Sequence, residues 1–153
     1  MEALIYVSTA TGLPRPKMVN EILCTARRIN PRLGLTGMLL WADTRFAQLL
    51  EGPADSLDLL YGRLLKDPRH HDLRMLMRWE IPQRLFPDWS MASRRLDPYQ
   101  AWELLERLGD STPKDAAAWV LYLMNEIRRV GLRKRQRARS RHTAARTGRW
   151  NGF

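Results

Sequence analysis

The hydrophobic pattern of the chain is densest between residues 30 and 52, in the sequence NPRLGLTGMLLWADTRFAQLLEG. Both halves of this stretch are apolar at successive positions, which is typical of strands covered on both faces of a sheet. Asp43-Thr44 predicts a tight turn between antiparallel strands over 33–42 and 45–51. Gln48 is the polar exception, and a buried carboxamide needs hydrogen-bond partners. The pattern therefore predicts a central hairpin that carries one polar group.

Strand and helix patterns alternate on either side of this hairpin. A β-rich run over 3–8 precedes apolar residues at helical spacing, and Asn30-Pro31 ends that helix because the residue before proline avoids the α region. A second helical pattern lies between Gly52-Pro53 and Asp67-Pro68. Strands are predicted over 73–81 and 89–93. Alternation in the first of these predicts one shared face for Leu73, Met75, Met77, Trp79 and Ile81.

The resulting order, β-α-β-β-α-β-β, is typical of a ferredoxin-like α+β fold. Such a fold has a mixed five-stranded sheet with both helices on one face. Two further helical patterns begin near Pro98 and Pro113, and we expect this helical hairpin to cover the other face. In the first of them, residues spaced by three predict the apolar stripe, namely Tyr99, Trp102, Leu105 and Leu108. We therefore expect a domain over 1–96, cap or output helices over 97–130 and a tail over 131–153.

The net charge of +10 is unevenly distributed along the chain. Residues 1–127 carry 16 basic and 16 acidic side chains, whereas residues 128–153 carry 10 basic side chains and no acidic one. The tail from 131 has no apolar stripe, which predicts a disordered or marginally helical segment. Binding to nucleic acid, binding to an acidic membrane surface or protein patch, and improved solubility all remain open for it.

Several classes of location and chemistry are disfavoured. The single cysteine, Cys24, excludes a disulfide within the chain, and neither a signal-peptide pattern nor a membrane span is found, so the cytoplasm is expected. His70, His71 and His142 have no metal-site spacing, so no metal is predicted. No phosphate-binding loop or nucleophile elbow is present, which leaves a hydrolase with little support and no catalytic residue to name.

The remaining polar and aromatic candidates are ordinary when taken singly. Tyr6 is typical of a sheet tyrosine, Asn30 of a residue that ends a helix, and Gln48 of a paired amide, while Trp89 and Met91 are typical of a core. Taken together, a phenol and a carboxamide on central strands can face each other beneath the helices. Such a pair suits a planar polar ligand.

At these residues the sequence resembles the BLUF family, the blue-light sensors that use flavin. The resemblance covers residues 3–96, about three-fifths of the chain. It consists of five motifs in order, which are LIYVS, RRINPRLGLTGMLLW, FAQLLEG, LLKDPRHH and FPDWSM. Ile29 departs from the pattern, because many members have a second asparagine there.

The resemblance implies a role for each matched residue. Tyr6 would donate an electron and a proton to the excited flavin, and Gln48 would bridge the two and rearrange its hydrogen bonds by rotation or tautomerisation. Asn30 would hold the C4 carbonyl and N3 edge of the ring. Trp89 and Met91 would exchange places and relay the signal. The other implied flavin contacts are Ile22 and Leu64 at the apolar end, and Arg63, Asp67 and His70 at the polar edge.

The resemblance also implies a blue-light photoreceptor and not an enzyme. FAD is the expected cofactor, with FMN and riboflavin as alternatives. A short stand-alone sensor would signal to a separate effector protein, and self-association through the sheet or the C-terminal helices is a further expectation. The alternative is a ferredoxin-like nucleic-acid-binding module that acts through its basic tail, although the basic-aromatic strand motif of RNA-recognition domains is absent.

Overall fold

The computed structural model describes residues 1–13 and 15–147, so the end of the predicted tail, 148–153, lies outside the described residues. The order of elements confirms the expected β-α-β-β-α-β-β followed by two helices. They are β1 (Glu2–Ala10), α1 (Pro16–Ile29), the 3₁₀ helix η1 (Asn30–Leu33), β2 (Thr36–Ala42), β3 (Arg45–Gly52), α2 (Ala54–Leu64), β4 (His70–Glu80), β5 (Ala92–Arg95), α3 (Pro98–Asp110) and α4 (Pro113–Thr147).

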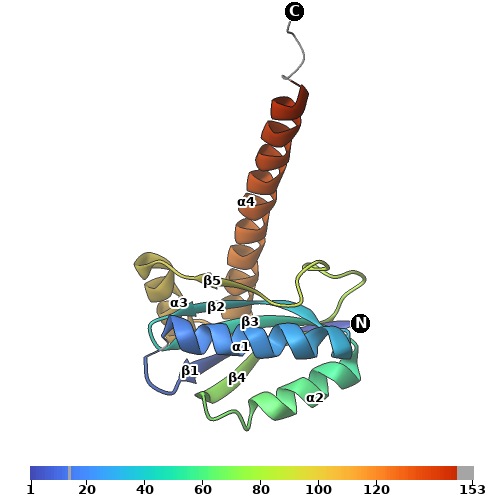
Figure 1. Cartoon of the computed structure of the whole chain (residues 1–153). Coiled ribbons are helices and arrows are strands. Elements are labelled where there is room, and N and C mark those ends of the chain that lie inside the picture. The colour runs from blue at the N-terminus through green and yellow to red at the C-terminus, as the bar shows by residue number, and fades with distance from the viewer. Residues whose placement is uncertain (14, 148–153) are drawn as a thin grey trace, which may run out of the picture. The chain divides into compact units, whose positions relative to one another are not determined.

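The five strands form one mixed sheet in the order β4-β1-β3-β2-β5, which is the expected ferredoxin-like arrangement. Only β2 and β5 are parallel, and the other neighbours are antiparallel. Helices α1 and α2 lie on one face of this sheet and α3 on the other (Figure 1). The predicted hairpin β2–β3 therefore occupies the middle of the sheet, where both faces are covered.

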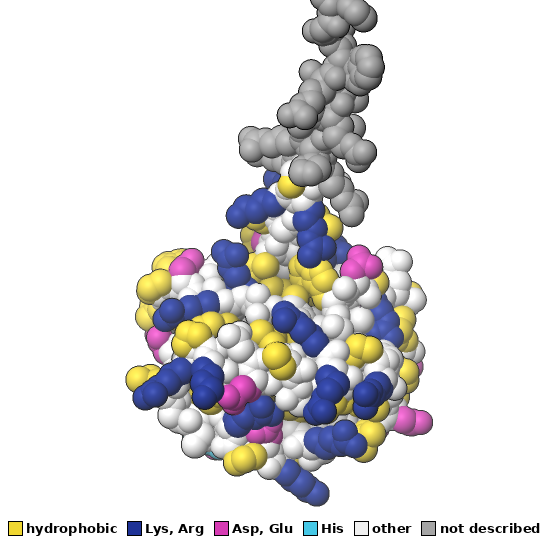
Figure 2. All heavy atoms as spheres, in the orientation of Figure 1, with side chains coloured by type: hydrophobic (Ala, Val, Ile, Leu, Met, Phe, Trp, Pro, Cys, Tyr) yellow, Lys and Arg dark blue, Asp and Glu magenta, His cyan; other side chains and the backbone are white. Residues whose placement is uncertain are grey.

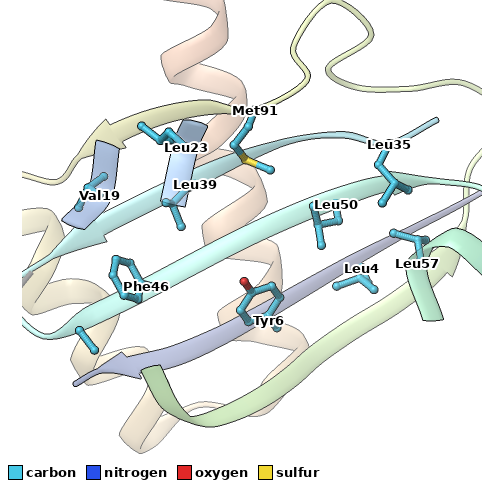
Figure 3. Close-up of a cluster of buried hydrophobic side chains, with 11 residues drawn as sticks. Leu4, Tyr6, Val19, Leu23, Leu35, Leu39, Phe46, Leu50, Leu57 and Met91 are labelled. Atoms are coloured by element: carbon cyan, nitrogen blue, oxygen red, sulfur yellow. The ribbon is translucent and has the colours of Figure 1, made fainter. Parts of the chain in front are cut away.

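The hydrophobic core on the α1 and α2 face is built from alternate strand residues. Leu4, Leu39 and Leu50 from the strands pack with Leu23 of α1 and Leu57 of α2 (Figure 3). The residues between them, such as Ile5 and Leu49, are buried on the opposite face. Burial of each such side chain contributes about 1.5–3 kcal/mol, so two apolar faces hold the central strands in place.

The first strand of the central hairpin begins later than predicted, at Thr36 instead of residue 33. Asn30–Leu33 forms a 3₁₀ turn, and Gly34 follows in the left-handed region at φ +66°. The Leu35 N–H donates to the Asn30 carbonyl at 2.8 Å, which closes this turn before the strand starts. The backbone N–H and carbonyl groups bonded within this turn are therefore not available to pair with a neighbouring strand.

Strand β4 does not present one continuous apolar face, so that prediction is wrong. Its register against β1 shifts between Ile5 and Tyr6, where Tyr6 pairs with Met75 but Ile5 pairs with Met77. Leu73 and Met75 pack on the core beneath α1 and α2. Because an extra residue reverses the alternation, Met77 lies on the other face.

Three of the four residues predicted to form the apolar stripe of α3 are exposed, and Leu108 is half-buried. Tyr99 is 68% exposed and Trp102 is 55% exposed, whereas Ala101 and Leu104 are buried. A helix turns every 3.6 residues, so residues spaced strictly by three drift away from the face that the helix buries. The helix itself begins as its sequence suggests, because Asp97 and Gln100 form a capping box.

Helix α4 continues to Thr147, where the sequence predicts a disordered or marginally helical tail from 131. Arg, Lys, Gln and Ala, which dominate this segment, all have favourable helix propensities. The chain divides into a compact unit Met1–Leu121 and a second unit that starts at Tyr122, within α4. The expected boundaries at 96 and 130 therefore stay predictions. None of the helices described is both long enough and apolar enough to cross a lipid bilayer.

Candidate functional site

The phenol of Tyr6 and the carboxamide of Gln48 form a buried pair at the centre of the sheet. The two residues lie directly opposite each other on the antiparallel strands β1 and β3, and therefore on the same face. They are only 2% and 6% exposed. The Tyr6 hydroxyl donates a hydrogen bond to Gln48 Oε1. The predicted pairing of phenol and carboxamide is thus present beneath α1 and α2.

The second partner of Gln48 is Met91, which comes from the segment before β5. Gln48 Nε2 donates to Met91 Sδ at 3.2 Å, and the methionine is buried. Figure 3 shows the Met91 side chain on the same face of the sheet as Tyr6 and Leu39. The hydrogen-bonded path therefore runs from Tyr6 through Gln48 to Met91.

Two side chains at the C-terminal end of α1 hold the backbone around Met91. Arg27 Nε donates to the Met91 carbonyl at 3.0 Å. Asn30 Nδ2 donates to the Ser90 carbonyl at 2.7 Å. The position of Met91 beside Gln48 is therefore set by a helix end as well as by the sheet.

Trp89 does not lie in a strand, because the last strand begins later than the predicted 89–93. Strand β5 begins only at Ala92, and the Trp89 ring stacks on Phe86 with 5.5 Å between ring centroids. The Trp89 carbonyl accepts from the Gly37 N–H at 2.9 Å. The carbonyls of residues 89, 90 and 91 thus each accept a separate hydrogen bond. The segment therefore loops into the site before the regular pairing of β5 begins.

A cavity of about 150 Å³ opens between α1, α2 and the sheet, beside the Tyr6–Gln48 pair. It brings together every residue predicted to contact flavin, although those contacts stay predictions. These lining residues are Tyr6, Ile22, Asn30, Gln48, Arg63, Leu64, Asp67 and His70.

Sequence reasoning missed other residues of this cavity. Phe46 lines it, and strand alternation with Gln48 was a sufficient signal to find it. Arg69 also lines it and forms an ion pair with Asp67 at 2.6 Å. The Asp-x-Arg spacing around Pro68 was the available signal for that pair. Arg27 does not line the cavity but holds the Met91 carbonyl, and no sequence signal indicates this contact because the two residues are 64 positions apart in the chain.

The electrostatics of the cavity keep Tyr6 protonated. Burial raises the pKa of the Tyr6 hydroxyl far above its usual value, and the negative charge of Asp67 raises it further. Arg69 opposes this effect but does not cancel it. The hydrogen bond from Arg69 lowers the pKa of Asp67, so that carboxylate stays charged. Tyr6 is therefore a neutral hydrogen-bond donor to Gln48 at physiological pH.

The polar groups of the cavity fit one edge of a planar heterocycle. Among the residues that the structure describes, none donates a hydrogen bond to Asn30 Oδ1, although the residue is buried and lines the cavity. This oxygen is an acceptor suited to an imide N–H such as that of a flavin. Ile22, Leu60 and Leu64 supply apolar surface for an unsubstituted or methylated ring end. A flavin ring matches this combination of groups.

His70 links the cavity wall to β1. Its Nδ1 lies 2.8 Å from the hydroxyl of Ser8, which is fully buried. Burial lowers the pKa of His70, Asp67 acts in the opposite direction, and Arg69 lowers the pKa further. The imidazole therefore resists protonation in the folded protein more than it does in the unfolded chain.

We expect acidification from pH 7.5 to 5.5 to lower the thermal unfolding temperature, and His70→Asn to reduce that fall. In this window the unfolded chain, with a histidine pKa near 6.5, binds more protons than the folded protein does. Stability therefore rises with pH across the window. Circular dichroism melts at several pH values measure the slope. An unchanged slope in His70→Asn contradicts the assignment.

Comparison with known protein families matches the first three-fifths of the chain. Residues 1–92 match the BLUF family model, described as sensors of blue light using FAD. The beta subunit of the photoactivated adenylate cyclase of Euglena longa is 36% identical over 94 residues, which are 61% of this chain and 11% of the cyclase subunit. The blue light- and temperature-regulated antirepressor BluF of Escherichia coli (strain K12) is 30% identical over 110 residues, 72% of this chain and 27% of BluF. The chain thus spans a minor part of these relatives.

Solved structures agree with these matches. The dark-state structure of the BLUF protein BlrB has a TM-score of 0.64 and 36% identity, with 76% of this chain and 89% of BlrB covered. A bacterial light-regulated adenylyl cyclase has the same TM-score of 0.64 and 30% identity, with 82% of this chain and 39% of the cyclase covered. The matches are to light sensors, so a nucleic-acid-binding module is not favoured as the function of the domain.

The motifs, the ferredoxin-like sheet, the Tyr6–Gln48–Met91 path and the family match over residues 1–92 agree with one another. The chain belongs to the BLUF family of flavin-dependent blue-light sensors.

Proposed function

We propose that the whole chain works as a blue-light photoreceptor that binds FAD between α1 and α2 and reports excitation through Gln48. The observation that carries the proposal is the path of hydrogen bonds from the Tyr6 hydroxyl to Gln48 and from Gln48 to Met91 Sδ. Tyr6 and Gln48 line the cavity, and Met91 lies behind them as the further partner of Gln48. It connects the candidate flavin site with the segment that leads to β5.

Different residues of the cavity are proposed to contact different parts of the cofactor. Asn30 Oδ1 would accept from the imide edge of the ring, and Ile22 and Leu64 would contact its apolar end. Arg63 and His70 line the cavity and would contact the polar part of the cofactor. Asp67, fixed by Arg69, adds a charged acceptor there. FAD is the form favoured by the family match, and the cavity contacts do not select it over FMN or riboflavin.

Tyr6 is the group of the cavity wall that can give up an electron together with a proton. Bound FAD supplies the absorption of blue light and, once excited, a strong electron acceptor. The raised pKa keeps Tyr6 neutral, so loss of an electron from the phenol releases the proton on Oη. That proton lies on the hydrogen bond to Gln48 Oε1, which makes the carboxamide its first acceptor. Return of the electron and proton restores the neutral phenol.

Gln48 converts this transient event into a longer-lived change of hydrogen bonds. While Tyr6 is oxidised, its hydroxyl no longer donates to Oε1, and the carboxamide is released to change orientation or tautomer. A change at Nε2 breaks the bond to Met91 Sδ. Loss of one such bond is worth roughly 1 kcal/mol, enough to bias a segment that is nearly balanced between two arrangements. Met91 is therefore the proposed output of the site, and the stacked Trp89 is its proposed exchange partner.

The signal is proposed to pass by contact with a separate protein and not by a reaction of the chain itself. Strand β5 continues directly into α3, and α3 presents exposed Tyr99 and Trp102 to solvent. Their rings lie 6.1 Å apart, so they form a small apolar patch of the kind found at protein interfaces. The same patch suits self-association. A cytoplasmic location is proposed because Cys24, the single cysteine, is exposed as a free thiol.

We expect the purified protein to be yellow and its flavin absorption band to shift reversibly to the red under blue light. A donor that newly contacts the ring carbonyl stabilises the more polar excited state, which lowers the transition energy. Absorption spectra before, during and after illumination test this. Protein that stays colourless after refolding with excess FAD, FMN or riboflavin overturns the proposed function.

A further inference from the structure

The C-terminal part of α4 is a continuous basic helix that the light-sensing site does not use. Residues 128–147 contain eight Arg and one Lys but no Asp or Glu. Twenty helical residues extend about 30 Å. The preceding 127 residues carry equal numbers of basic and acidic side chains. The charge is therefore a property of this segment alone and not of the sensor domain.

The described side chains at 132–136 of this segment are exposed. Arg133, Lys134 and Arg135 are consecutive and exposed. Successive residues of a helix are rotated by about 100°, so three in a row distribute charge around the axis instead of along one face. Figure 2 shows basic side chains on the described part of α4, whereas basic and acidic side chains are mixed over the rest of the visible face. A partner with negative charge on more than one side of the helix fits this distribution.

The composition favours a nucleic-acid duplex over a membrane surface. Helices that lie in a membrane interface need an apolar face with residues such as Trp, Phe or Leu. Residues 131–147 contain a single large apolar residue, Leu132, and no aromatic residue. Eight of the nine cations are arginines, whose planar fork binds phosphate by two parallel hydrogen bonds.

The dimensions also match a DNA duplex. B-form DNA carries one phosphate charge per about 1.7 Å of its axis and has a major groove wide enough for an α-helix. Continuous basic helices are known to enter that groove, whereas the major groove of duplex RNA is too narrow for side-chain readout. We propose that residues 128–147 of α4 bind double-stranded DNA through its phosphates, without reading the base sequence.

This binding is expected to depend steeply on salt. If six to eight of the nine cations contact phosphates, the slope of log K against log salt is about −5 to −7. Affinity then falls about 10³- to 10⁴-fold between 50 and 200 mM salt. Two duplexes of unrelated sequence should bind equally. Flavin and light are not required, so the binding is measured in the dark and its outcome is independent of the photocycle.

The test is fluorescence anisotropy of a labelled 20-base-pair duplex with the full-length protein at 50–200 mM NaCl. The informative variant is the triple change Arg133→Gln, Lys134→Gln and Arg135→Gln, because glutamine removes charge but preserves helix propensity. It should weaken binding at least about tenfold at 50 mM salt and reduce the slope by about 3. Circular dichroism checks that the helix content is unchanged.

A matched control removes the same net charge from the sensor domain. Lys17, Arg28 and Arg32 are exposed cations of α1 and η1, and changing all three to Gln should alter the dissociation constant less than about twofold. An equal loss in both triple variants overturns the proposal, because net charge alone would then explain binding. Tighter binding to phosphatidylserine vesicles than to the duplex also overturns the proposal. The same holds if poly-glutamate competes as well as DNA does at the same concentration of charge. Absence of duplex binding at 50 mM salt overturns it as well.

Discussion

Tyr6→Phe is expected to keep the protein yellow and to abolish its reversible red shift. The substitution removes one oxygen atom from a side chain that is otherwise enclosed by apolar neighbours, so the cavity keeps its shape. It also removes the only donor that Tyr6 offers to Gln48 Oε1. Without the Oη proton, the coupled transfer of electron and proton from this side chain cannot occur. Absorption spectra recorded under illumination measure the loss.

The same variant has a modest expected effect on folding. Loss of one buried hydrogen bond lowers the free energy of unfolding by about 1 kcal/mol, which for a domain of this size corresponds to a few degrees in Tm. Flavin content after purification checks that the site remains intact.

Tyr61→Phe is the matched control for this experiment. The Tyr61 ring packs edge-on against Tyr6 with 6.2 Å between ring centroids, so it shares the environment of the site. Its hydroxyl is not the partner of Gln48, whose Oε1 accepts from Tyr6. We expect Tyr61→Phe to retain the red shift. A normal shift in Tyr6→Phe, or loss of the shift in both variants, removes Tyr6 from its assigned role.

Glu51→Ala is expected to cause the largest loss of stability of any single change outside the apolar core. Glu51 is 0% exposed, and its carboxylate accepts from the Leu85 N–H at 2.7 Å and from the Phe86 N–H at 3.0 Å. Thr36 Oγ1 donates to the same carboxylate at 3.3 Å. Hydrogen bonds to a charged acceptor contribute about 1.5–3 kcal/mol each, so the free energy of unfolding should fall by roughly 3 kcal/mol or more.

Glu51→Ala should also change the rate at which the light-induced state returns to the dark state. The carboxylate of Glu51 ties the connection between β4 and β5 to the sheet, and the same connection leads to Met91. With that tie removed, we expect the connection to move more freely and the occupancy of the Gln48–Met91 contact to fall. Urea unfolding followed by circular dichroism measures the first effect, and the rate of dark recovery measures the second.

Glu80→Gln provides the control, because Glu80 is an exposed glutamate at the end of β4. Substitutions at exposed positions usually change stability by less than about 0.5 kcal/mol. Equal urea midpoints for wild type and Glu51→Ala contradict the anchoring role. Glu51→Gln should be intermediate, because it keeps one carbonyl acceptor but places an N–H₂ group opposite a backbone donor.

The pattern of the sequence determined the architecture because the central strands are apolar on both faces. Such strands fit only the middle of a sheet that is covered on both faces. The sequence therefore predicted the order of elements along the chain and the two helices that cover one face of the sheet. Tyr6 and Gln48 were predicted to lie on central strands where they can face each other, and the resemblance to the BLUF family implied that they do; the register of β1 and β3 places them opposite each other. Local signals also determined the start of α3, where Asp97 and Gln100 cap the helix.

Tertiary structure decided the features that depend on contacts between distant segments. The register shift beside Tyr6 reverses the faces of β4, and alternation within one strand cannot reveal an extra residue opposite its neighbour. Met91 lies in the site and Trp89 lies outside it because Arg27 and Asn30 hold the backbone of residues 90 and 91, about 60 positions away in the chain. Tyr99 and Trp102 face solvent because the packing of α3 selects Ala101 and Leu104. Local periodicity sets which residues share a face, but only the packing of the elements decides which face is buried.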